Sequence, residues 1–358
     1  MKNQSRWFAW TVGIFLAAPT GAVWAQEAPT GVTQQQQAPA VEARFGGLTF
    51  SGTGDVSSDS QELLVRAQKK NLFDTPLLVF GRGKVGQQQF QSHDLHVWGE
   101  EVGAGWVLDP ATDLLLGYRH DSYSTFNLSP DSDPAYRDAA GRHDVAAFGL
   151  TGVRDRRDDD YFPTRGYRAQ LGGELAVRGW GGDYSFGRLG SDFAAYFTPW
   201  RDRAGEAWWS EITFVEHLRL GWMESFGASD EVPYFERYVV GGGNTVRGHR
   251  GDWLSPRRID DQFIGGEAQF VNNVEARLPI LKEKCCNRLS AALFFDMGRS
   301  YRRFSHFGDL GFGAGAGLRY IVHFWQIHGV LRLDYGVNLA PEDDDSRSRL
   351  HVIFGSPF

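Results

Sequence analysis

A glycine-rich turn is the first candidate for chemistry in this sequence. Gly81, Gly83 and Gly86 have the spacing of a dinucleotide-binding turn and follow an apolar run. Such a turn binds phosphate only when a helix begins directly after it. Here three glutamines and another strand-like run come next, so we interpret the segment as a strand that contains glycines.

Acidic runs, histidines and cysteines are the other candidates, and none has the spacing of a metal or catalytic site. The aspartates at 158–160 and 343–345 lie in connections, where acidic residues are usually solvated. The sequence contains no His-Glu-x-x-His pair and no Gly-x-Ser-x-Gly turn. The neighbours Cys285 and Cys286 could pair only with strain, and we interpret them as turn residues. We therefore predict no metal site, no cofactor and no enzyme activity.

The N-terminus has the pattern of an export signal. Lys2 and Arg6 precede an apolar run over residues 7–18, and small residues before position 26 fit cleavage after Ala25. The apolar run is too short for a membrane-spanning helix, which needs about 20 residues. We predict a signal peptide at 1–25, a Gln-rich polar linker at 26–40 and one barrel domain at 41–358. The linker is far too short to be an independent domain.

Alternating side chains are the main signal in the rest of the chain. Segments of roughly 10 to 15 residues alternate apolar and polar positions, separated by clusters of turn-forming residues. The clearest segment has Leu331, Leu333, Tyr335, Val337 and Leu339 on one face, opposite Arg332, Asp334, Gly336 and Asn338. A period of two with charges on one side is typical of a strand between lipid and a hydrated interior. A soluble β-sandwich produces the same pattern in a single strand, so the number of such strands matters more.

We count about 14 candidate strands, within a range of roughly 12 to 16. An even number puts both chain ends on the periplasmic side, with short connections such as 108–112 there and longer ones such as 124–142 outside. Only helices and closed barrels satisfy every backbone hydrogen bond in lipid, and no later segment is apolar enough for a membrane helix. The predicted fold class is therefore all-β, an antiparallel transmembrane β-barrel. The net charge of −7 argues against nucleic-acid binding.

Four stretches in a fixed order carry a family resemblance. The first is a turn with Asp155, Phe162, Pro163 and Gly166, and the second is an aromatic-rich approach followed by Gly242, Gly243, Val246, Arg247, Gly248 and His249. The third and fourth are strands that carry Glu275 and Asp296. Together they resemble the barrel domain of the BamA/TpsB-type outer-membrane superfamily, also called the bacterial surface antigen family, over roughly residues 45–358. His249 stands where that family usually has Phe or Tyr.

The resemblance implies that the segment around Arg247 is a long external loop that folds into the lumen, where its Arg reaches an acidic residue. Alternation puts Asp296 and Glu275 on the inner wall, and an Arg fork suits bidentate binding of a carboxylate. The alternative is that all three are ordinary solvated lumen charges. The glycines from Gly311 to Gly317 would leave space for close approach of a backbone. By the same resemblance, Phe358 is the terminal residue recognised during barrel assembly.

The resemblance also sets the functional expectation. A barrel of this kind, without the periplasmic POTRA domains, would lie in the bacterial outer membrane and insert or translocate polypeptides. Its partners would be outer-membrane lipid, unfolded polypeptides and a separate periplasmic protein. The alternatives are a plugged transport pore without an assembly role, an outer-membrane phospholipase and a soluble exported β-sandwich. A phospholipase needs Ser, His and a polar orienting residue together on the outer face, and no spacing singles out such a triad.

Overall fold

The computed structural model describes residues 41–45, 48–56, 60–89, 93–160, 162–203, 207–256, 264–282, 288–303, 308–324, 327–341 and 347–354. The predicted signal peptide, the predicted linker, the two cysteines and Phe358 lie outside these residues. Within the described ranges, no helix has both the length and the apolarity needed to cross a membrane.

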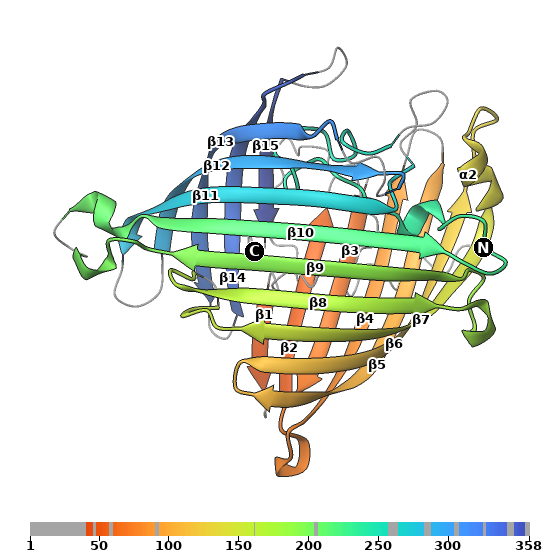
Figure 1. Ribbon diagram of the computed structural model, residues 1–358, viewed down its shortest axis with the longest axis horizontal. Helices are drawn as coiled ribbons and strands as arrows, with labels where there is room; N and C mark the ends of the chain where they lie inside the picture. Colours follow the sequence, from red (N-terminus) through yellow and green to blue (C-terminus); the bar gives the residue numbers. More distant parts are fainter. Residues whose placement is uncertain are drawn as a thin grey trace.

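Within the described residues, fifteen strands form one sheet, and each is paired with the next in chain order (Figure 1). Their bounds are β1 Val41–Phe45, β2 Leu48–Val56, β3 Ser60–Lys69, β4 Leu77–Gln89, β5 Asp94–Asp109, β6 Thr112–Phe126, β7 Gly141–Asp155, β8 Gly166–Ala176, β9 Phe186–Phe197, β10 Thr213–Ser225, β11 Ala268–Lys282, β12 Arg288–Tyr301, β13 Gly311–Phe324, β14 Ile327–Asn338 and β15 Ser348–Phe354. The helices are single turns in the connections: η1 Leu72–Asp74, α2 Pro134–Asp138, η2 Arg178–Trp180, η3 Arg201–Arg203, η4 Trp208–Glu211 and η5 Tyr234–Glu236.

The sheet closes on itself at β14. One edge of β14 pairs along its length with β13. The other edge is shared, because Leu331 to Val337 face β15 while His328 faces Glu42 of β1. The short strands β1 and β15 therefore share the same edge of β14. The all-β barrel prediction is confirmed: the predicted strands correspond to β2 through β15, and β1 is the strand that alternation missed.

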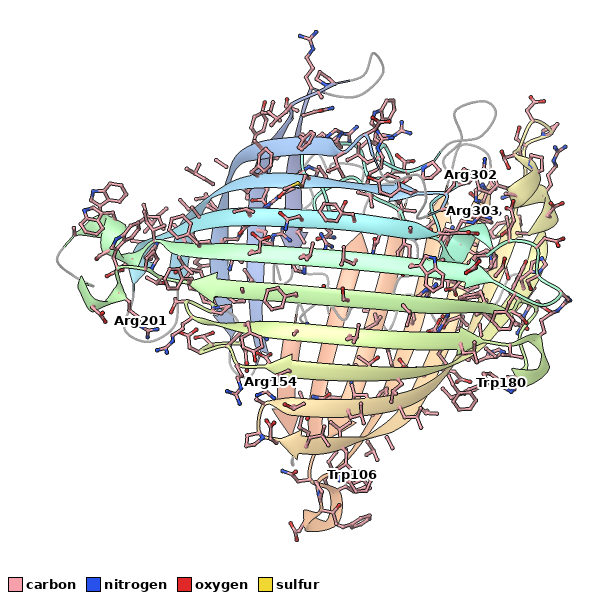
Figure 2. All side chains as sticks on the ribbon, in the orientation of Figure 1. Trp106, Arg154, Trp180, Arg201, Arg302 and Arg303 are labelled. Atoms are coloured by element: carbon pink, nitrogen blue, oxygen red, sulfur yellow. The ribbon has the colours of Figure 1, made fainter. Side chains whose placement is uncertain are left out.

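The two faces of the wall differ as the alternation predicts. On β14, Leu333 is 39% exposed on the outside, whereas Asp334 has no exposed surface on the inside. Large apolar side chains cover the outer face of most strands, as a lipid-facing wall requires. Trp106 near the end of β5 and Trp180 after β8 point away from the wall toward opposite ends of the strands (Figure 2). This placement matches the aromatic girdles at the two membrane interfaces.

The connection between β10 and β11 folds into the barrel, and we call its described residues, 226–256 and 264–267, the inward loop. Its first half packs Phe235 and Tyr238 into an apolar cluster with Tyr123 of β6. Its second half packs Val246 and Trp253 against β11. Tyr238 and Gly266 exchange two backbone hydrogen bonds of 2.8 Å, which hold the two halves together. The predicted lumen loop is therefore present and buried.

A second connection enters from the opposite end. The turn between β7 and β8 buries Phe162 against Ile321 of β13 and Val330 of β14, on the inner wall. Gly166 ends this turn with φ +99°, a conformation that disfavours any side chain, and a Cβ there would overlap the carbonyl of Arg156. Chain segments therefore fill the lumen from both ends of the barrel.

Candidate functional site

Local backbone geometry brings Arg247 to the inner wall. Gly241 and Gly248 have φ of +131° and +94°, which glycine adopts without strain. Between them, the Gly241 amide donates to the Thr245 hydroxyl at 2.7 Å and tightens the turn. A Cβ on Gly248 would lie 2.7 Å from the Val337 carbonyl carbon of β14. The glycines of this motif thus allow the turn to press its backbone against the wall.

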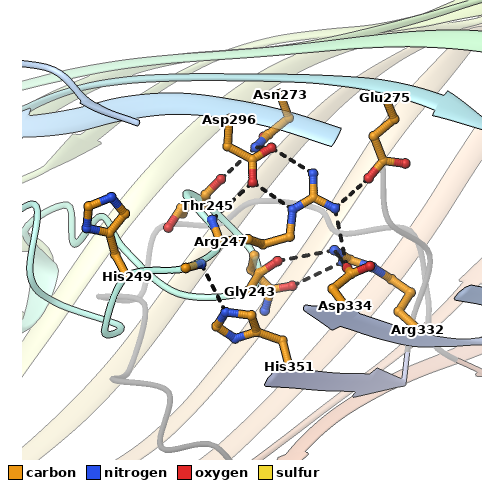
Figure 3. Close-up of polar contacts among 12 residues, drawn as sticks. Gly243, Thr245, Arg247, His249, Asn273, Glu275, Asp296, Arg332, Asp334 and His351 are labelled. Carbon is orange, nitrogen blue, oxygen red and sulfur yellow. Dashed lines mark hydrogen bonds and ion pairs between the residues drawn. The ribbon is translucent and has the colours of Figure 1, made fainter. Parts of the chain in front are cut away.

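Arg247 makes a bidentate ion pair with Asp296 of β12 (Figure 3). Its Nε donates to Oδ2 at 2.6 Å and its Nη2 donates to Oδ1 at 2.7 Å. The Arg247 backbone amide makes a third hydrogen bond to this carboxylate, donating to Oδ2 at 3.0 Å. Asn273 of β11 donates to the other oxygen at 2.8 Å. Because neither charged side chain is more than 1% exposed, all of these bonds form away from water.

The remaining Arg247 nitrogen reaches two further carboxylates. Nη1 donates to Oε1 of Glu275 at 2.6 Å and lies 3.3 Å from Oδ2 of Asp334. The ring of Phe294 lies below the guanidinium, with its centroid 3.5 Å from Cζ. A ring face attracts a cation in this position. Arg247 is therefore surrounded by three acids and one aromatic face.

Three arginines of the wall balance the acids. Arg277 and Arg319 donate to Glu275 at 2.9 Å each, and Arg319 also pairs with Asp334. Arg332 donates to Asp334 and to the Gly243 carbonyl, both at 3.1 Å. Breaking a buried pair leaves an uncompensated charge and is strongly destabilising. These wall arginines bind Glu275 and Asp334, whereas Arg247 of the loop is the cation that binds Asp296.

The glycines of β13 and β14 accommodate the loop backbone. A Cβ on Gly313 would overlap the Arg247 carbonyl, and one on Gly336 would overlap the Gly248 amide. A Cβ on Gly311 would overlap the side chain of Leu254. Alternation placed the glycines of β13 on the inner wall, and in the structure the inward loop fills the space left by Gly311, Gly313 and Gly336.

The other sequence-predicted residues divide into two groups. His249 lies with its Nε2 3.1 Å from the Phe312 carbonyl, and the Gly248 amide donates to His351 of β15 at 3.3 Å. The turn with Asp155 and Pro163 belongs to the opposite end of the barrel, where Asp155 pairs with Arg157 at 2.7 Å. The structure thus brings Arg247, Glu275 and Asp296 together and leaves the Asp155 turn outside that cluster.

A second attachment of the loop was missed by sequence reasoning. Glu236 has no exposed surface and accepts from Nη1 and Nη2 of Arg119 on β6 at 2.8 and 3.1 Å. Arg188 of β9 pairs with the same carboxylate and donates to the Glu236 carbonyl at 2.9 Å. Glu174 of β8 accepts from Nε and Nη2 of Arg119 at 2.8 and 2.6 Å. The only available signal was that Arg119, Glu174 and Arg188 alternate onto inner faces.

Aromatic rings surround this second attachment. Phe235 stacks on Tyr123 with centroids 4.1 Å apart, and the Tyr123 hydroxyl donates to Glu236 at 3.0 Å. Tyr234 meets His93, which lies just before β5, at a centroid distance of 5.3 Å. Burial lowers the pKa of His93 to about 4, with Asp94 acting in the opposite direction. In the described part of the chain, no group of three His, Cys, Asp or Glu is placed to hold a metal ion.

A closed antiparallel barrel with an apolar outer wall, a charged inner wall and an inward loop defines the class of outer-membrane β-barrels. The sequence model of the Omp85 superfamily domain matches residues 66–358, and the chain belongs to this superfamily. It is therefore an outer-membrane protein, and the suspected BamA/TpsB-type kinship is confirmed.

Named relatives agree with this assignment. The "Outer membrane protein assembly factor BamA" of Nitratidesulfovibrio vulgaris is 27% identical over 221 residues, which cover 61% of this chain and 26% of the relative. The protein of the same name from Neisseria meningitidis serogroup B is 25% identical over 149 residues, 40% of this chain and 17% of the relative. The chain thus matches about a quarter or less of the length of these curated relatives.

Solved structures support the same fold. BamA from Haemophilus ducreyi lacking POTRA domains 1–3 superimposes with a TM-score of 0.67 at 17% identity, covering 93% of this chain and 75% of that one. CdiB from Escherichia coli superimposes with a TM-score of 0.57 at 14% identity, covering 85% and 55%. These identities are low, so the likeness is one of architecture.

Proposed function

We propose that this barrel inserts or translocates polypeptides at the outer membrane. The observation that supports the proposal is the buried Arg247 cluster, which fixes an inward loop to the wall of a barrel whose curated relatives are named assembly factors. Binding a loop through one arginine to three carboxylates gives two discrete states, docked and released. A lumen that must pass or accommodate a chain needs such a removable obstruction.

Depletion of the gene tests the proposal directly. We expect other outer-membrane barrels, or a defined set of exported proteins, to fall in abundance when outer-membrane fractions are profiled by mass spectrometry. The decrease should be restored by the wild-type gene and not by Arg247→Ala. An unchanged profile in a strain fully depleted of the protein contradicts the proposal.

The partners in this proposal are outer-membrane lipid, unfolded polypeptides and a periplasmic protein that delivers them. Photo-crosslinkers placed in the turn between β7 and β8 would face such a delivery partner, because this turn enters the barrel from the periplasmic end. We expect crosslinks to a periplasmic protein and to nascent outer-membrane proteins. Crosslinks to lipid alone contradict this part of the proposal.

A plugged transport pore is the second candidate. It is favoured by a hollow of about 90 Å³ inside the barrel, lined by polar residues such as Gln170, Asp192 and Gln269. Planar-bilayer recordings separate the two candidates. A pore conducts steadily and selects among small solutes in the wild type, whereas a polypeptide-handling barrel with a docked loop stays closed until an attachment of the loop is removed.

A further inference from the structure

The site that holds Glu236 borders the hollow inside the barrel. Arg119, Glu174 and Arg188 contact Glu236 or one another, and the same three side chains line a hollow of about 90 Å³. Tyr238 of the inward loop forms another part of its lining. A molecule in the hollow would therefore meet the arginines that Glu236 occupies.

Two neighbouring strands carry glycines on the wall of the hollow, and the wall is open at one of them. Gly172 of β8 and Gly190 of β9 are direct partners in the sheet, and both line the hollow. A Cβ on Gly190 would come no closer than 3.8 Å to its neighbours, the nearest being the Leu220 carbonyl. In contrast to the glycines of β13, this one is not covered by the loop. Glycine in a strand is typical of sites where another backbone approaches closely.

Charge at the site depends on Glu236. The positive groups in contact around Glu236 are Lys84, Arg119 and Arg188, and the negative groups are Asp121, Glu174 and Glu236. Glu101, Asp192 and Arg219 also line the hollow. Without the Glu236 carboxylate, the cluster would carry one excess positive charge in a buried place. Within the described residues, Nε of Arg188 also has no hydrogen-bond acceptor. Both features favour an anion, and the forked donors of arginine suit a carboxylate.

We propose that Arg119 and Arg188 form a binding site for the carboxylates of acidic polypeptide segments in the lumen. In the absence of such a segment, Glu236 occupies this site as an intramolecular ligand. An entering Asp or Glu side chain displaces Glu236 from the two arginines. The inward loop then loses its attachment at Glu236. This inference rests on the proposed function, because it requires polypeptide segments inside the barrel. It adds a preference for acidic segments and a place where they bind.

Peptide binding to the purified, folded barrel in lipid nanodiscs tests the inference. The probes are a fluorescent, flexible Gly-Ser peptide that carries glutamates and the same peptide with glutamines in their place. Glu236→Gln removes the negative charge while keeping the shape of the side chain. We therefore expect this variant to bind the acidic peptide about tenfold more tightly than the wild type. The glutamine peptide should bind both proteins equally. Adding Arg188→Gln to Glu236→Gln should abolish the gain.

Matched controls separate the outcomes. Glu231→Gln removes an exposed carboxylate of the same loop and should leave both affinities unchanged; heat-modifiability on gels shows that each variant is folded. Equal binding of the two peptides, or no gain in Glu236→Gln, overturns this inference and leaves the proposed function standing. Absence of binding by either peptide to every variant contradicts both. Selective acidic binding with an unchanged depletion profile contradicts the proposed function alone.

Discussion

The inward loop is attached to the barrel at two places, and the attachments have opposite polarity. At Arg247 the loop supplies the cation, and β11, β12 and β14 supply the carboxylates. At Glu236 the loop supplies the carboxylate, and β6 and β9 supply the arginines. The Arg247 attachment also presses its backbone onto glycines, whereas the Glu236 attachment adjoins an open hollow.

This difference suggests that the two attachments of the loop have different roles. Where backbone and wall are in contact, a ligand has no room to enter, so the Arg247 side should mainly determine stability. Where the wall is open, a competing group can approach, so the Glu236 side should mainly determine release. Four changes of decreasing expected effect test this comparison.

The largest effect is expected from Arg247→Ala. The substitution leaves Glu275, Asp296 and Asp334 with one cation fewer in a buried site, which costs about 3–5 kcal/mol in the free energy of unfolding. Urea unfolding of the refolded barrel in lipid vesicles, followed by tryptophan fluorescence, measures it. Arg250→Ala is the control, because that side chain is 40% exposed and its surface pair is worth about 0–1 kcal/mol. Equal effects of the two substitutions would contradict the special role of Arg247.

A smaller loss of stability is expected from Glu236→Gln. The amide keeps part of the hydrogen bonding to Arg119 and Tyr123 but loses the charge, and a hydrogen bond to a charged group is worth about 1.5–3 kcal/mol. The same vesicle assay measures the loss of stability. Glu231→Gln is the control, because the Glu231 side chain is 49% exposed. In bilayers, Glu236→Gln should open more often than the wild type. A larger loss of stability than in Arg247→Ala would reverse the comparison.

Adding one methyl group to the covered wall tests the role of backbone contact. Gly313→Ala places a Cβ against the Arg247 carbonyl, and overpacking of this kind typically costs about 1–3 kcal/mol. Gly190→Ala adds the same methyl to the open wall, where its nearest neighbour would be 3.8 Å away. Its effect on the free energy of unfolding should be close to zero. If both alanines were tolerated, the loop would not be pressed against β13 as described.

The smallest effect is a pH dependence on the Glu236 side. The folded-state pKa of His93 is about 4, below its ordinary value of 6.5, so the unfolded state binds more protons between these values. The stability from neutral His93 is therefore complete above about pH 6.5 and is lost as the pH falls toward 4. We expect a difference of about 1–2 kcal/mol between pH 7 and pH 5 that His93→Gln abolishes. Identical pH profiles for the two proteins would exclude this contribution from His93.

Much of the fold follows from the period-two pattern, because one side of most strands is apolar and faces lipid while the other faces the barrel interior. Leu333 and Asp334 show the rule at its clearest. The pattern could not reveal β1, since five residues are too few to show a period. It also could not show that the turn containing Phe162 crosses to β13, because that contact depends on tertiary packing of a connection.

The site was only partly accessible from the sequence. Arg247, Glu275 and Asp296 were named through their family motifs, and they lie together in the structure. Asp334 and Arg319 alternate inward in the same way, but so do many other charges. Glu236 could not be paired with Arg119, because alternation identifies the face of a residue and not its partner across the lumen. Such pairing depends on where the inward loop lies, which no local pattern encodes.

The shared edge of β14 has a consequence for biogenesis. Each hairpin from β2 to β14 joins neighbours in the chain, so these pairs can form early and locally. The ring, however, closes only when Glu42 of β1 comes beside His328, after nearly the whole described chain has been threaded. Such long-range contacts form slowly, because the entropy of joining distant segments must be overcome first. The barrel should therefore exist transiently as an open, curved sheet. Its two unpaired edge strands must be covered by another molecule until they pair with each other.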